Sequence, residues 1–150
     1  MDPVWSNTRE TYIEAVGQDS VAADVVAFLY DLTETHEGLW LRPGKGVRPT
    51  FMADVRAGKR GPYLFSVSPA TKLVYFVPHR IDSLIGKRDP YWFTSYLKRA
   101  LEPVLRDPGI GHYLDIYMAD LAPRTDTMRD LVRDSVAQIG ASITSRTSHG

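Results

Sequence analysis

The residues best suited to chemistry are six cations within a short Gly- and Pro-rich stretch, residues 42–61 (RPGKGVRPTFMADVRAGKRG), which holds a single acid, Asp54. Glycine lets a backbone approach a phosphate closely, and Lys and Arg neutralise its charge. The pattern predicts contact with a polyanion; the alternative is protection of a strand edge against aggregation. The predicted phosphate ligands are Arg42, Lys45, Arg48, Arg56, Lys59 and Arg60.

Positive charge continues through the middle of the chain. Residues 1–40 carry a net charge of −7, residues 41–100 carry +9 and residues 101–150 carry −2, so a formal net charge of zero hides a polarised chain. Such asymmetry hints at a polyanion partner, although acidic and basic blocks folded against each other would also explain it. A second rim of phosphate ligands is expected at Arg88, Lys98 and Arg99, with Tyr91 and Trp92 as rings on which bases could stack.

Histidines offer a second chemistry, general acid and base catalysis of phosphodiester cleavage without a metal. His79, followed by Arg80 at the expected end of a strand, is the stronger candidate, and His36 is another. His112 shares the parity of the apolar residues in the strand that follows, which predicts a partly buried structural role. Scattered histidines are a weak pattern, so no catalytic residue is assigned and a protein that is not an enzyme is the favoured reading.

Other chemistries lack their residues. The chain has no cysteine, which excludes disulfides, thiolate metal sites and cysteine nucleophiles. It has no Gly-Lys-Ser/Thr phosphate loop, no Gly-x-Ser-x-Gly elbow and no histidine spacing typical of zinc. The segment YLFSV after Asp54 lacks the acid and lysine of a restriction-like metal nuclease. Neither a metal nor a cofactor is expected.

Period-two alternation must position the basic stretch. It predicts a four-stranded antiparallel meander over residues 38–77, with Phe51, Val55, Phe65, Tyr75 and Val77 buried or half-buried. A fifth strand is expected over 112–118. On this pattern Met52, Asp54 and Arg56 share the face opposite the core.

Apolar spacing at helical period flanks the sheet. Helices are expected from Asn7 as cap to Val16, from Asp19 or Ser20 with a buried face that includes Val21, over 90–106 after an Asp89-Pro90 start, and from about Thr125 to Gly140. The order predicts an α+β fold with helices packed on one face of a four- to five-stranded antiparallel sheet. A single domain over 1–150 is expected, with 1–6 and 141–150 frayed.

The apolar runs are far shorter than the ~20 residues that span a bilayer. The first residues also lack the basic start and apolar stretch of a signal peptide. A cytoplasmic protein without a membrane partner is therefore expected.

Three segments carry a resemblance: HEGLWLRPGKGVRPTFMADV, GPYLFSVSPATKLVYFVP and YWFTSYLKRALEPVL. Together, over about residues 36–105, they resemble a group of small uncharacterised prokaryotic helix/β-meander domains that often accompany restriction and repair nucleases. The resemblance implies a nucleic-acid-related accessory role. It brings no diagnostic catalytic residue, because the shared pattern is one of strands and turns.

These observations favour a nucleic-acid-binding or nucleic-acid-associated accessory module whose basic, Gly-rich β-hairpin contacts phosphates. Two alternatives stay open. In the first, the acidic residues 1–40 of one chain pair with the basic residues 41–100 of another, in a protein-interaction or self-assembly module. In the second, the protein is a small metal-independent nuclease.

Overall fold

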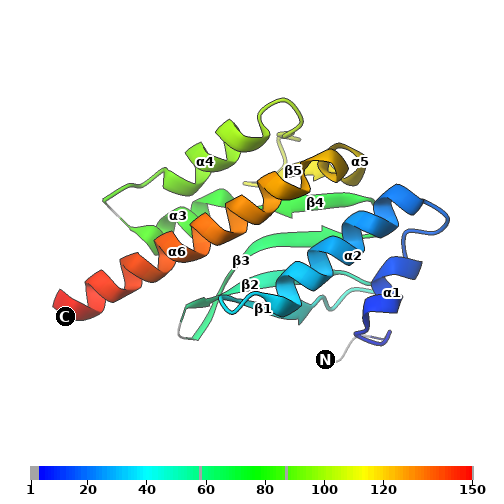
Figure 1. Ribbon diagram of the computed structural model, residues 1–150, viewed down its shortest axis with the longest axis horizontal. Coiled ribbons are helices and arrows are strands. Elements are labelled where there is room, and N and C mark those ends of the chain that lie inside the picture. The colour runs from blue at the N-terminus through cyan, green and yellow to red at the C-terminus, as the bar shows by residue number, and fades with distance from the viewer. Residues whose placement is uncertain (1–3, 58, 87, 150) are drawn as a thin grey trace.

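Alternating apolar residues build a five-stranded antiparallel sheet on which the helices pack, so the fold is α+β (Figure 1). The computed structural model describes residues 4–57, 59–86 and 88–149, with side chains other than those of 57, 59–61 and 144–149. The strands follow one another across the sheet in chain order. They are β1 (Leu39–Pro43), β2 (Phe51–Ala57), β3 (Lys59–Ser68), β4 (Leu73–Phe76) and β5 (Leu114–Tyr117). The predicted meander over 38–77 and the fifth strand are confirmed, with β5 shorter than predicted.

The β2–β3 pair contains a bulge. Ala53 pairs with Phe65 but Asp54 pairs with Tyr63, so β3 has one extra residue between the two pairs. Leu64 and Phe65 are both fully buried as a result. A bulge of this kind breaks strict alternation and re-aims the side chains on either side of it.

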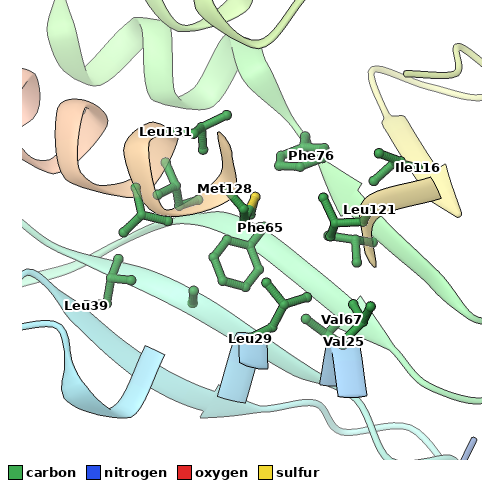
Figure 2. Packing of buried hydrophobic residues seen from close by; sticks show 14 of the residues in the cluster. Val25, Leu29, Leu39, Phe65, Val67, Phe76, Ile116, Leu121, Met128 and Leu131 are labelled. Atoms are coloured by element: carbon green, nitrogen blue, oxygen red, sulfur yellow. The ribbon is translucent and has the colours of Figure 1, made fainter. Parts of the chain in front are cut away.

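The core lies between the sheet and helices α2 (Ser20–Thr35) and α6 (Thr125–His149). Figure 2 shows Phe65 of β3 among Leu29 of α2 and Met128 of α6, all of them fully buried. The predicted burial of Phe51, Val55, Phe65 and Val77 is confirmed, and Tyr75 is half-buried. Gly38, at the start of β1, packs so tightly on Val136 of α6 that a Cβ would not fit there without a shift.

The first two helices are close to those predicted. Thr8, rather than Asn7, caps α1 (Arg9–Glu14), because its Oγ1 accepts a hydrogen bond from the Thr11 amide. Asp19 caps α2 through the Ala22 amide and Ser20 is its first residue, in agreement with the predicted start at Asp19 or Ser20. The prediction that Val21 lies on the buried face of α2 is wrong: Val21 is 46% exposed. The buried residues of this helix are Ala22, Val25, Val26, Leu29 and Thr33.

Helix α3 (Pro78–Ile85), which closely follows β4, has no counterpart among the helices predicted from the sequence. The next helix also starts later than predicted, and a residue of α3 caps it. The helix predicted over 90–106 is α4 (Trp92–Leu101), and Asp89 does not cap it. The Asp82 carboxylate of α3 instead accepts hydrogen bonds from the Phe93 and Thr94 amides, at 2.7 and 3.3 Å. A cap supplied from another helix has no local sequence signature.

The chain ends in a run of helical turns. Helix α5 (Met118–Leu121) and a 3₁₀ turn, η1 (Ala122–Arg124), connect β5 to α6. α6 begins at Thr125 as predicted, but it continues through Gly140 to His149, so the prediction that Gly140 ends this helix is wrong. The fraying expected for residues 1–6 and 141–150 stays a prediction. Among the described residues, no helix has the length and apolar character needed to cross a membrane.

Candidate nucleic-acid interface

The face of the sheet opposite α2 and α6, which we call the outer face, carries mainly aromatic and charged side chains, with Met52 and Leu73 among them. Trp40 of β1 is 51% exposed and Tyr117 of β5 is 45% exposed. The strand register places the other members between these two edges. The outer face comprises Trp40, Arg42, Met52, Asp54, Arg56, Tyr63, Ser66, Leu73, Tyr75, Asp115 and Tyr117.

One row of paired residues crosses all five strands of this face. Arg42 pairs with Met52, Met52 with Ser66, Ser66 with Tyr75 and Tyr75 with Asp115. Side chains of directly paired residues lie on the same face, about 5 Å apart from strand to strand. The row therefore runs from a cation on β1 to a carboxylate on β5.

Two buried carboxylates lie on the outer face, and each pairs with an arginine. Arg42 Nε donates a hydrogen bond to Asp54 Oδ2 at 2.6 Å, and Arg106 Nη1 lies 3.3 Å from Asp115 Oδ1. Asp54 is 5% exposed and Asp115 is 3% exposed. Within the described part of the chain, Asp54 Oδ1 accepts no hydrogen bond, and Asp115 Oδ1 has the ion pair with Arg106 but no hydrogen bond. The two arginines therefore offset the charge of the two buried carboxylates, and each pair is neutral overall.

Both exposed rings of the outer face have an arginine against them. The guanidinium of Arg56 lies 5.0 Å from the Trp40 ring centroid, and that of Arg106 lies 4.3 Å from the Tyr117 ring centroid. Arg56 Nε also donates to the Leu39 carbonyl oxygen at 3.1 Å, which fixes its orientation. Each edge of the face thus presents an aromatic ring beside a positive charge.

Between these edges the face is hollowed. Segment 107–113, which precedes β5, forms one side of a hollow of about 540 Å³. Tyr63, Tyr75 and Tyr113 line it, together with Asp115. The Tyr75 and Tyr113 rings meet edge to face, with centroids 6.4 Å apart. We call this the tyrosine hollow.

The environment of Tyr63 shows which charges approach the tyrosine hollow. Burial raises the pKa of the Tyr63 phenol, and the Tyr113 phenol raises it further. Arg80 of α3 and Arg42 of β1 act in the opposite direction on the same pKa. Arg80, the cation next to the candidate His79, therefore acts on the same phenol as Arg42 of the outer face.

The predicted phosphate ligands of residues 42–60 do not form one cluster. Lys45 and Arg48 are exposed in the loop between β1 and β2, whereas Arg56 lies at the other end of β2. β2 has seven residues, so these ends are separated by roughly 20 Å. Lys59 and Arg60 belong to the backbone of β3, but their side chains lie outside the described ones. Arg42 and Arg56 both lie on the outer face, Arg42 towards the end near the β1–β2 loop and Arg56 towards the opposite end.

The residues of the second predicted rim, Arg88, Lys98 and Arg99, also do not lie together. Arg88 is exposed before α4, and Lys98 is exposed on α4 and lines a cleft beside segment 107–113. Arg99 lies instead over the ring of Tyr96, with its guanidinium 5.5 Å from the ring centroid. The Tyr96 hydroxyl in turn donates to Asp134 of α6 at 2.6 Å, so Arg99 faces α6 rather than the cleft.

The two predicted stacking rings lie apart from the outer face. Trp92 is partly buried against the core, with its ring centroid 5.3 Å from that of Tyr96. Tyr91 is 70% exposed and lines a hollow between α3 and α4. Trp92 is thus a packing residue, and Tyr91 is exposed to solvent at the α3–α4 hollow, away from the outer face.

The fold brings two of the three candidate histidines together. His79 of α3 and His112 of segment 107–113 have ring centroids 4.7 Å apart. Both are exposed, so the prediction that His112 is a partly buried structural residue is wrong. His36 forms a turn after α2, where its Nδ1 accepts a hydrogen bond from the Gly38 amide. His36 precedes β1, whereas His79 follows β4. Two strands lie between β1 and β4, so these two strands are about 14 Å apart.

Sequence reasoning missed Tyr113, Tyr117 and Arg106. A signal was available for the two tyrosines: in HYLDIYM the apolar residues have one parity, and Tyr113, Asp115 and Tyr117 share the other. No pattern in the sequence indicated Arg106, because it reaches the outer face through an isolated backbone bridge to Asp115, outside the named strands. Across the described residues, no three His, Cys, Asp or Glu side chains are grouped so that they could hold a metal ion.

Comparison of the chain with family models, curated proteins and solved structures gives no match. The resemblance of residues 36–105 to small prokaryotic domains therefore stays a prediction.

Proposed function

We propose that the protein binds single-stranded nucleic acid on the outer face of its sheet. The observation that carries the proposal is the pairing of rings with arginines on that face: Trp40 with Arg56 and Tyr117 with Arg106. Base stacking on exposed rings next to positive charge is how single strands are held without sequence readout. In this role the rings stack on bases and the arginines contact the phosphates between them.

A single strand fits this surface better than a duplex does. The rings stand on strands of a pleated sheet, where only unpaired bases can stack on them. Trp40 on β1 and Tyr117 on β5 flank the tyrosine hollow, so a strand crossing the sheet meets rings on both sides. The β1–β2 loop adds two exposed cations, Lys45 and Arg48, at the end of β1.

The test measures affinity for fluorescently labelled single-stranded RNA and DNA by anisotropy. Removal of the two exposed rings, Trp40→Ala and Tyr117→Ala, should weaken binding by about 1–3 kcal/mol for each ring. Tyr91→Ala removes a ring that is more exposed but lies away from the outer face, and it should leave the affinity unchanged. Loss of affinity with Tyr91→Ala but not with the outer-face changes would reject the outer face as the binding site.

The salt dependence of binding tests the phosphate contacts. Changing Arg56, Lys59 and Arg60 together to Gln should flatten the slope of log affinity against log salt by about two units, because each phosphate contact accounts for ~0.7–0.9. Strand-edge protection makes the opposite prediction: the triple variant aggregates faster and polyanion binding is unchanged.

An ion pair within the chain argues against the head-to-tail alternative. Lys72 Nζ lies 3.0 Å from Asp19 Oδ2, so one acid of residues 1–40 already pairs with one base of residues 41–100 in the same chain. Pairing between chains requires an oligomer. A monomeric mass in solution, measured by light scattering at low salt, would exclude it.

A further inference from the structure

A cleft next to the tyrosine hollow gathers two imidazoles and an ammonium group. His79 comes from α3, Lys98 from α4 and His112 from segment 107–113, and all three line one cleft of about 230 Å³. The imidazole centroids are 4.7 Å apart, and the three side chains are exposed. Thr94 and Asp107 also line the cleft. Binding on the outer face leaves this cluster without a role.

Two imidazoles beside a cation can transfer protons at a phosphodiester. General acid–base catalysis needs one group to take a proton and one to supply it, and histidine serves in both roles. A nearby ammonium stabilises the charge that develops on the phosphate oxygens. The residues match what RNA cleavage requires without a metal.

From this arrangement we infer that the cleft cleaves single-stranded RNA by transesterification. One imidazole removes the proton of a ribose 2′-hydroxyl, and the 2′-oxygen attacks the adjacent phosphorus. The bond from phosphorus to the 5′-oxygen of the next nucleotide breaks, and the other imidazole, as its imidazolium, donates a proton to that oxygen. The products are a 2′,3′-cyclic phosphate and a 5′-hydroxyl. Lys98 contacts the non-bridging phosphate oxygens throughout.

The two concavities share a wall, which gives the substrate a path. Tyr113 lines both the cleft and the tyrosine hollow. A base held in the hollow therefore places a neighbouring phosphate near His79 and His112. In this respect the inference rests on the proposed function, because the outer face delivers the strand to the cleft.

The experiment follows cleavage of a labelled single-stranded RNA by the full chain in the presence of a metal chelator. His79→Gln and His112→Gln should each slow cleavage by about 10²–10⁴-fold, and Lys98→Gln by about 10²-fold. His36→Asn is the matched control: its side-chain oxygen can accept the Gly38 amide, so cleavage should be unchanged. DNA of the same sequence, which lacks the 2′-hydroxyl, should be bound but not cleaved.

The outcomes separate this inference from the proposed function. RNA binding without cleavage overturns the inference and leaves the proposed function intact. Cleavage at the same rate in the two histidine variants, or cleavage of DNA, also overturns it. Cleavage that depends on His79 and His112, while Trp40→Ala and Tyr117→Ala leave RNA affinity unchanged, retains the cleft and rejects the outer face as the binding surface.

Discussion

The two faces of the sheet are built by the same strands but differ in what they bury. The inner face buries Phe51, Phe65 and Ile116 against helices, and these side chains have no polar atoms to satisfy. The outer face buries the carboxylates of Asp54 and Asp115, and it exposes Trp40 and Tyr117. One face is organised by the exclusion of water and the other by charges that compensate one another.

This difference separates stability from function. Burial of an apolar side chain on the inner face stabilises the fold directly. A buried carboxylate costs free energy unless a charge and hydrogen bonds offset that cost. Arg42 and Arg106 provide this compensation for the outer face, and Arg106 also lies against the Tyr117 ring. Polar groups kept at such a cost are candidates for a functional role.

The largest expected effect comes from the inner face. Phe65→Ala should lower the free energy of unfolding by about 3–5 kcal/mol, because it opens a cavity in the centre of the core. Tyr117→Ala, on the outer face, should cost well under that, about 1 kcal/mol or less, because the ring is already 45% exposed. Chemical denaturation of both variants measures the difference. Equal losses of stability would mean that Tyr117 is packed as a core residue is, and that the outer face is not open to solvent.

The ion pair of Arg42 and Asp54 tests compensation on the outer face. Arg42→Gln should lower the free energy of unfolding by about 1–3 kcal/mol, because the carboxylate of Asp54 stays buried without its cation. The double variant Arg42→Gln, Asp54→Asn removes the unpaired charge and should recover part of that loss. A double variant less stable than Arg42→Gln would contradict this account of the pair.

A third buried carboxylate, that of Asp82, sharpens the comparison because its partners are uncharged: the Phe93 and Thr94 amides and the Thr94 hydroxyl. Asp82→Ala should destabilise the protein by about 0.5–2 kcal/mol, since α4 loses its N-terminal cap. Asp89→Ala, at the position predicted as the cap, is the matched control and should have a negligible effect. The free energies of unfolding of the two variants decide between the caps.

The smallest effect is expected from alkaline titration. Burial and the bond to Asp134 raise the pKa of Tyr96 to about 12, and burial raises the pKa of Tyr63 on the outer face. A raised folded-state pKa gives stability that is complete below the unfolded value, about 10, and is lost as pH rises towards the folded value. The free energy of unfolding should therefore fall between pH ~10 and ~12.

Tyr96→Phe tests the cause, since phenylalanine retains the ring but cannot ionise. This variant should lose stability less steeply over the same alkaline range. A pH profile identical to that of the unchanged protein would show that Tyr96 does not contribute to the loss.

Local patterns in the sequence determined the sheet and most of the helices. Alternation over 38–77 predicted four strands because side chains on a strand point to opposite faces in turn. It failed where the bulge in β3 buries both Leu64 and Phe65. Helix α3 was missed because HRIDSLI is short and follows an apolar strand with no polar N-cap of its own. Its stability comes from packing, which local propensity does not report.

The candidate site depends far more on tertiary structure. The sequence predicted cations in residues 42–60, but the strand β2 between them decides that Lys45 and Arg56 lie at opposite ends. Nothing local indicates that Arg106 pairs with Asp115. The phosphate contacts were predicted from local composition. Which rings lie beside the arginines depends on the register of the five strands, which the sequence does not show.

What the sequence determined by itself is the chemistry available: no thiols, few histidines, a basic middle and alternating strands. Only the tertiary structure decided which groups meet. His79 and His112 are far apart in the chain, and they come together because α3 follows β4 while segment 107–113 leads into β5, the neighbour of β4. The physical reason is that strand pairing joins residues by register and not by sequence distance. A pattern read along the chain reports periodicity, but not proximity.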